Sequence, residues 1–260
     1  MPGKVRSEVD GSVGWVVFDH PERRNAISQN MWGELAEAID RLGADDSVRV
    51  VVMRGEGGEA FVSGADISQF SGADGRQTSK RLDAGGGDAF ARLSALEKPL
   101  IAMIDGYCIG GGLAIALCAD LRYAAENASF GIPAAKLGVG YGLEGIEKLV
   151  SAVGLSSAKE VLYTARRYAA SEALAMGLVN RVVGSGELRS TVDGIAAEIA
   201  ANAPLTVRSV KILAHQLQRE PSRRDSERIE SALAACFESE DFSEGVKAFM
   251  EKRSPAFKGR

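Results

Sequence analysis

The pattern of apolar and polar positions predicts strands in the first part of the chain and helices in the second. Alternation over residues 13–19 indicates a strand, and the apolar runs 48–53 and 100–104 indicate buried strands. Apolar residues recur at helical spacing between 29 and 42, which predicts a helix with Ser28 as its N-cap. Strand, helix and strand therefore follow one another at short intervals.

The same reading continues to the end of the chain. Residues 61–70 are expected to form a loop and a short helix, and the polar, glycine-rich residues 71–87 a mobile segment. Short strands are expected at 121–124 and 129–130. Helices are expected over residues 88–97, 113–118, 143–152, 155–163, 171–177, 187–202, 205–218, 223–237 and 241–252. We therefore predict one α/β core, residues 1–200, followed without a linker by a helical region, residues 201–260.

Composition narrows the class of protein. The 260 residues are 45% hydrophobic and 25% charged, with a net charge of -4, which indicates a globular protein and no nucleic-acid binding. No signal peptide or membrane-spanning run is evident, and three widely spaced cysteines suit a reducing compartment, so a cytoplasmic protein is expected. His20 and His215 have no partners at metal-ligand spacing, so no metal site is predicted.

The run of three glycines from Gly110 to Gly112 carries the clearest chemistry. Peptide N–H groups at glycine can approach a ligand closely, and a helix that starts there directs its positive end to the same point. Such a site suits an oxygen that develops negative charge. Of the neighbouring side chains, Tyr107 and Cys108 alone could transfer a proton, and Cys108 and Cys118 are predicted to be core residues.

The glycine run and five further segments together resemble the enoyl-CoA hydratase/isomerase (crotonase) family over almost the whole chain. Besides the glycine run, they are His20–Ala26, Phe61–Ile67, Phe130–Gly142, Ala173–Asn180 and Glu244–Arg253. The resemblance implies a spiral of ββα units whose helical C-terminal region forms homotrimers, often paired into hexamers. It also implies a coenzyme A thioester as the substrate, with no prosthetic group.

The resemblance further implies roles for individual residues. The backbone N–H groups of Ala65 and Gly111 would form an oxyanion hole for the thioester carbonyl. From its position after Gly64, Asp66 is interpreted as a helix cap rather than an acid catalyst. The residues expected around coenzyme A are Arg24, Asn25, Ala26, Ala65, Asp66 and Ile67, with Phe249 and Lys252 from an adjacent subunit.

Two positions depart from the hydratase pattern. Hydratases of this family use two glutamates, and this chain has Ala114 and Ala134 at the matching positions. Since methyl groups transfer no protons, two-glutamate hydration is disfavoured. Related isomerases and a dehalogenase place an aspartate where this chain has Gly142.

Tyr141 and Glu144 remain as candidate catalytic side chains. The run 137–145 is similar to methylmalonyl-CoA decarboxylase, which carries a tyrosine matching Tyr141. The position of Glu144 equally fits an ordinary acid in the first turn of a helix. Three functions stay open: an enzyme that stabilises a thioester enolate, a decarboxylase or isomerase that uses Tyr141 or Glu144, and a non-catalytic acyl-CoA-binding subunit.

Overall fold

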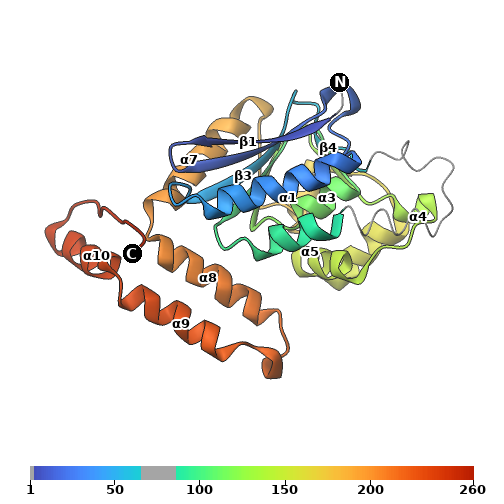
Figure 1. Cartoon of the computed structure of the whole chain (residues 1–260). Coiled ribbons are helices and arrows are strands. Elements are labelled where there is room, and N and C mark those ends of the chain that lie inside the picture. Colours follow the sequence, from blue (N-terminus) through green and yellow to red (C-terminus); the bar gives the residue numbers. More distant parts are fainter. Residues whose placement is uncertain (1–2, 66–85) are drawn as a thin grey trace.

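Two β-sheets form the centre of the molecule in the computed structural model, which describes residues 3–65 and 86–260 (Figure 1). The first sheet has the order β1-β2-β3-β5-β7-β10, and the second has the order β4-β6-β8-β9. The strands are β1 Lys4–Asp10, β2 Val13–Asp19, β3 Val50–Gly55, β4 Ala60–Val62, β5 Leu100–Ile104, β6 Tyr107–Ile109, β7 Leu121–Ala125, β8 Ser129–Gly131, β9 Tyr168–Ala169 and β10 Arg181–Val183.

The chain spirals through these sheets. The pairs β3/β4, β5/β6 and β7/β8 each add one strand to the first sheet and one to the second, and the strands pair in parallel with those of the next turn. Pairing is antiparallel between β1 and β2 and between β8 and β9. The predicted α/β fold of repeated ββα units is confirmed.

Helices cover the sheets and form the C-terminal region. Residues 86–95 are helical. The other α-helices are α1 Gln29–Ala44, α3 Gly111–Ala116, α4 Ala134–Leu137, α5 Leu143–Thr164, α6 Ala170–Ala175, α7 Leu188–Ala201, α8 Pro204–Leu217, α9 Ser226–Phe237 and α10 Glu240–Glu251. Single 3-10 turns lie at η1 Pro21–Arg23, η3 Ser185–Glu187 and η4 Pro221–Arg223. None of the helices in the described ranges is long and apolar enough to cross a membrane.

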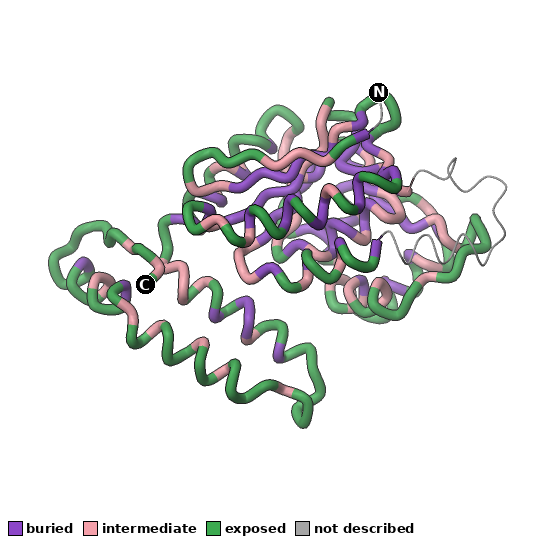
Figure 2. Tube along the Cα trace, in the orientation of Figure 1, coloured by how far each residue is buried: buried purple, intermediate pink, exposed green. Residues whose placement is uncertain are grey.

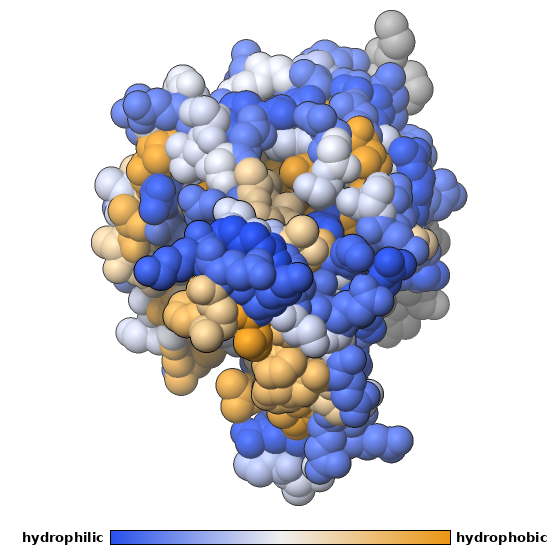
Figure 3. Space-filling view, turned by 90° about the vertical axis from the view of Figure 1, so that its left-hand side faces the viewer, coloured by the Kyte–Doolittle hydropathy of each residue, from blue (hydrophilic) through white to orange (hydrophobic). Residues whose placement is uncertain are grey.

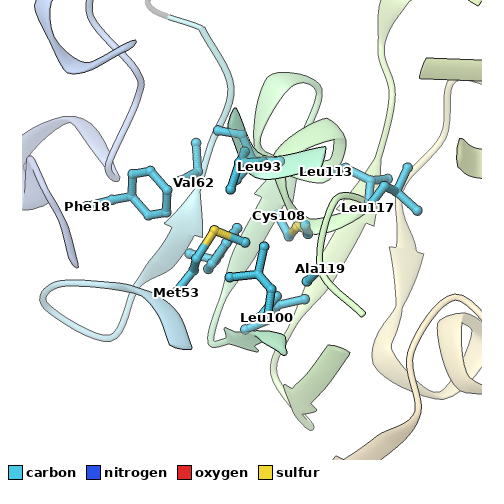
Figure 4. Close-up of a cluster of buried hydrophobic side chains, with 14 of the residues drawn as sticks. Phe18, Met53, Val62, Leu93, Leu100, Cys108, Leu113, Leu117 and Ala119 are labelled. Atoms are coloured by element: carbon cyan, nitrogen blue, oxygen red, sulfur yellow. The ribbon is translucent and has the colours of Figure 1, made fainter. Parts of the chain in front are cut away.

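Alternating side chains of β2 and β3 enter two separate cores. Phe18 and Met53 point to the larger core, which α1 covers and which continues to α3 and α5. Val17 and Val52 point to the other face, where α7 packs with Leu188, Val192, Ala196 and Ala200. In Figure 4, Phe18, Met53, Cys108 and Leu113 lie close together in the larger core, which therefore holds β6 and α3 in place.

The structure corrects several sequence predictions, including one missed strand and the ends of some helices. The strand β1 was not predicted, because its charged, half-exposed residues hide the antiparallel pairing with β2. The helix expected at 113–118 begins at Gly111 and ends at Ala116. Ser28 is the N-cap residue, but its hydroxyl donates to Asn30 Oδ1 instead of accepting a helix N–H.

The helices expected at 143–152 and 155–163 form one element broken at Gly154, whose φ of 76° is not helical. The expected loop 61–70 begins with the end of β4, and its residues 66–70 lie outside the described residues, as do 71–85 of the expected mobile segment. Residues 86–87 belong to a helix instead.

The C-terminal helices α8, α9 and α10 extend away from the sheets (Figures 1 and 2). The last residues return to α10, where the buried Asp241 carboxylate accepts the N–H groups of Lys258 at 2.6 Å and Gly259 at 2.7 Å. Arg49 ties this tail to the sheet, since its guanidinium donates to the carbonyl oxygens of Ala200 and Phe257. The tail and the N-terminal sheet are therefore directly connected.

Candidate functional site

The glycine run lies where β6 ends and α3 begins. Gly110 has a φ of 55° and is the N-cap of α3, and its N–H donates to the carbonyl of Gly131 on β8. A Cβ on Gly112 would lie 2.1 Å from the carbonyl oxygen of Val62, so β4 and α3 can approach this closely only because residue 112 is glycine. The positive φ therefore explains Gly110, and steric fit explains Gly112.

Gly111 has a different environment. A Cβ built on it would meet nothing closer than the backbone nitrogen of Ala65, at 3.6 Å. The structure therefore brings Ala65 and Gly111 together, although they are 46 positions apart in the sequence. Within residues 3–65 and 86–260, no hydrogen-bond acceptor takes the backbone N–H of either residue.

Ala65 is held by the neighbouring loop. Gly64, with a φ of 123°, accepts the N–H of Ile27 at its carbonyl oxygen, and Ile27 and Ala65 form a parallel bridge. One residue earlier, the N–H of Ser63 donates to the carbonyl of Arg24. The segment that carries Ala65 is thus bonded along its length to the loop of residues 24–27. Asp66 and Ile67 lie outside the described residues.

The loop formed by Arg24, Asn25 and Ala26 uses its own N–H groups internally. They donate to the carbonyl oxygens of Pro21, His20 and Arg23, respectively. The carbonyl of Arg24 accepts the N–H of Ser63, and the carbonyl of Ala26 lies within hydrogen-bond distance of His20 Nδ1. A ligand at this loop would therefore find carbonyl oxygens rather than vacant N–H donors.

Two arginines flank an aromatic ring beside this loop. The guanidinium carbons of Arg24 and Arg167 lie 5.0 Å and 5.2 Å from the centroid of Tyr107, within cation–π range. Sequence reasoning did not single out Arg167, which follows Arg24 by 143 positions, and no local pattern marks such a contact.

Tyr141 and Glu144 have contrasting surroundings. The hydroxyl of Tyr141 is buried and has no hydrogen-bond partner among the described residues, while its ring packs on Gly145. Burial, with a smaller contribution from the thiols of Cys118 and Cys108, raises the pKa of Tyr141 to about 12. Glu144 is exposed in the first turn of α5. Tyr141 is thus a protonated donor at neutral pH, whereas Glu144 faces solvent.

The remaining polar candidates near the glycine run are less reactive. Burial raises the pKa of the Cys118 thiol to about 11 and also raises the pKa of Cys108, so both stay protonated. Ala114 lies on α3 and Ala134 begins α4, both partly buried and without a titratable group. Among the described residues, no group of three or more His, Cys, Asp or Glu side chains could hold a metal ion.

Phe249 and Lys252 lie far from the glycine run within one chain. They belong to α10 and its C-cap, at the opposite end of the molecule from α4 (Figure 1). Phe249 is 82% exposed, and it lines an apolar cavity of about 570 Å³ together with Phe237, Phe242 and Met250. Figure 3 shows hydrophobic side chains gathered on this side of the molecule.

A larger cavity of about 780 Å³ lies elsewhere, between the C-terminal end of α1 and the start of α8. Its charged groups already have partners: Arg92 pairs with Asp40, and Lys98 donates to two carbonyl oxygens at the end of α1. We therefore interpret it as a cleft between structural elements and not as the reactive site.

Comparison with known proteins gives a consistent result. Residues 8–260 match the family model described as enoyl-CoA hydratase/isomerase. The chain is 36% identical to a short-chain-enoyl-CoA hydratase of Clostridium acetobutylicum, with 97% of each chain covered. It is also 36% identical to a carnitinyl-CoA dehydratase of Proteus mirabilis, with 96% of each covered.

The fold comparison agrees with the sequence comparison. A crystal structure of an enoyl-CoA hydratase/carnithine racemase from Magnetospirillum magneticum superposes with a TM-score of 0.91 at 35% identity. The alignment covers 98% of this chain and 96% of that one. The similarity thus extends through both sheets and the C-terminal helices.

Proposed function

The chain belongs to the enoyl-CoA hydratase/isomerase family, and we propose that it stabilises the enolate of an acyl-CoA thioester at the N–H groups of Ala65 and Gly111. One observation carries this proposal. A Cβ on Gly111 would lie 3.6 Å from the nitrogen of Ala65, and neither N–H has an acceptor within the described ranges. The two backbones therefore lie side by side, and among the described residues both N–H groups are left to donate to a ligand oxygen.

The chemistry follows from these donors. An oxygen that gains negative charge as the enolate forms is held more tightly in the transition state than the neutral carbonyl. Each such donor contributes about 3 kcal/mol to lowering the barrier. Because α3 has six residues, the peptide N–H groups are the main source of this stabilisation, with little from the helix dipole. No prosthetic group or metal is required for this step.

For binding, we propose that the adenine amino group donates to carbonyl oxygens of the loop Arg24, Asn25 and Ala26. The N–H groups of this loop are occupied, and so are the carbonyls of Arg24 and Ala26, but a carbonyl oxygen has two lone pairs and can accept a second hydrogen bond from the ligand. Asp66 and Ile67 continue the proposed site beyond the described residues. Phe249 and Lys252 would reach coenzyme A from an adjacent subunit.

The last point requires an oligomer, which we propose is a homotrimer or a hexamer formed from two trimers. We propose that residues 201–260 are the oligomerisation region. The exposed apolar side chains of α9 and α10 support this, since Phe249 and Met250 are 82% and 77% exposed in one chain.

For proton transfer, we favour Tyr141 over Glu144. The buried Tyr141 hydroxyl has no partner among the described residues, so a bound substrate would satisfy it. With its pKa raised to about 12, it suits a hydrogen-bond or proton donor and not a base at neutral pH. This favours decarboxylation or isomerisation as a second candidate function, in which the phenol orients a carboxylate or protonates the enolate.

Hydration of simple enoyl-CoA esters is expected to be weak. The relatives named as a hydratase and a dehydratase make this reaction the natural first assay. Ala114 and Ala134 nevertheless provide no carboxylate to activate water.

The test is to incubate the purified protein with crotonyl-CoA, a 3-enoyl-CoA and methylmalonyl-CoA, following absorbance of the conjugated thioester and release of CO₂. Turnover of the second or third ester, lost in Tyr141→Phe, supports the proposal. Rapid hydration of crotonyl-CoA that is lost in Glu144→Gln contradicts the role given to Tyr141. Binding without turnover of any ester indicates an acyl-CoA-binding subunit instead.

A further inference from the structure

Asn25 is a fully buried polar residue in an unusual backbone conformation. Its φ is 54°, a left-handed value that costs free energy for most residues but little for asparagine or glycine. Its side chain is 0% exposed. A buried amide in such a conformation is retained only when its hydrogen bonds are satisfied.

The Asn25 amide makes three hydrogen bonds that join two segments of the chain. Its Oδ1 accepts the N–H of His20 at 2.9 Å, and its Nδ2 donates to the carbonyl oxygens of Glu56 at 3.0 Å and Ala60 at 2.7 Å. A Cβ on Gly55 would lie 2.7 Å from this Nδ2, so the amide occupies space left open by a glycine. The side chain therefore fixes the loop of residues 20–27 to the connection between β3 and β4.

Ala60 is the first residue of the segment that leads to Ala65. From Ala60 onward, the hydrogen bond from Ser63 to Arg24 and that from Ile27 to Gly64 continue the same attachment. The Asn25 amide is thus the buried end of a row of bonds, and the N–H of Ala65, which has no acceptor among the described residues, lies at the other end. A shift of residues 60–64 relative to the loop of residues 24–27 would move Ala65 relative to Gly111.

We propose that Asn25 is a positioning residue that couples the coenzyme-binding loop to the oxyanion donor of Ala65. This inference rests on the proposed function of both groups. The loop and the donor then behave as one rigid unit. A defect at Asn25 impairs the reaction even on a thioester that lacks the nucleotide.

Two variants test the proposal. Asn25→Asp keeps the size of the side chain but turns the two donated bonds into contacts between oxygens. Asn25→Gly removes all three bonds, introduces no buried charge and accepts the φ of 54° readily. Asn30→Asp is the matched control, because the Asn30 amide bonds to Gly3, Ser28 and Glu34 and to no residue of 60–65.

Two readouts are needed. The first is kcat and KM on the CoA ester that the protein turns over and on the N-acetylcysteamine thioester of the same acyl group. We expect both Asn25 variants to lose about 100-fold in kcat on the truncated ester, the effect of a displacement of about 1 Å at a reacting group. A raised KM for the CoA ester with unchanged kcat on the truncated ester overturns the proposal.

The second readout is hydrogen exchange of the amides in residues 60–65, measured on the protein without substrate. The proposal requires faster exchange there in both variants, while strand β5 stays protected as in the control. Unchanged exchange in 60–65 overturns it. Because this experiment needs no turnover, it decides the coupling even if no acyl-CoA ester reacts and the proposed function itself fails.

Discussion

Substitution of Gly111 by alanine separates steric fit from catalysis in the glycine run. The new Cβ would lie 3.6 Å from Ala65 N and 3.9 Å from the carbonyl carbon of Gly64, which are ordinary van der Waals distances. Gly111 is helical, so alanine suits its backbone. A Gly→Ala change at a compatible position stabilises a protein by about 0.4–1 kcal/mol. The folded protein is therefore expected to tolerate Gly111→Ala, with a melting temperature equal to the wild type or about 2–4 °C higher.

The same methyl group would lie beside the Ala65 donor, 3.6 Å from its nitrogen. An oxygen that accepts the Ala65 N–H lies about 2.9 Å from the Ala65 nitrogen. The new Cβ would lie 3.6 Å from the same nitrogen, so the oxygen and the Cβ overlap when they lie in similar directions from it. Loss of one oxyanion donor lowers kcat by about 100- to 1,000-fold, and we expect a decrease of this size.

The assay compares kcat and thermal unfolding for three variants. Gly194→Ala, in α7 with open space around it, should keep full activity and gain stability. Gly112→Ala, whose Cβ would lie 2.1 Å from the Val62 carbonyl oxygen, should lose stability. Wild-type kcat in Gly111→Ala, on every ester that the protein turns over, would refute the assignment of the oxyanion hole to Gly111.

Three further predictions address neighbouring parts of the molecule. Tyr141→Phe should lower kcat about 100-fold without loss of stability, and the wild-type profile should show no ionisation of this phenol below pH 10, because its pKa is raised to about 12. Asp120→Ala leaves the buried Lys211 without its carboxylate partner at 2.8 Å and should cost about 3 kcal/mol in urea denaturation. The pKa of Glu244 is lowered from 4.5 to about 2 by its bonds to Arg253 and the Ala256 N–H, so its contribution to stability is present above pH 4.5 and lost as the pH falls towards 2. Glu244→Gln should therefore be less stable at neutral pH and lose less on acidification, as thermal unfolding at several pH values would measure.

The elements that sequence analysis predicted best are strands whose side chains are buried on both faces of the sheet. The runs at 48–53 and 100–104 form β3 and β5, whose side chains are apolar because both faces of the sheet are covered. Strand β1 was not predicted, because its charged residues face solvent and the strand is stabilised by backbone pairing with β2. Short strands such as β9, with two residues, depend wholly on their neighbours.

The candidate site was predictable where glycine constrains the backbone. Gly112 is required by its approach to Val62, and such steric demands leave a visible pattern in the sequence. The Tyr141 hydroxyl, which has no partner among the described residues, and the amide bonds of Asn25 are different, because they depend on atoms brought together by packing. No local pattern distinguishes a buried asparagine that joins two distant segments from one that merely forms a turn.

The bonds of Arg49 have a consequence for synthesis of the chain. Its guanidinium donates to the carbonyl of Phe257, a residue 208 positions later. At about 5–20 residues per second, the ribosome needs about 10–40 s to make the intervening chain. During that interval the Arg49 guanidinium lacks its bond to Phe257 and stays hydrated. A nascent chain stalled within this period leaves the start of β3 without the tail, and it is the species that we expect chaperones to bind.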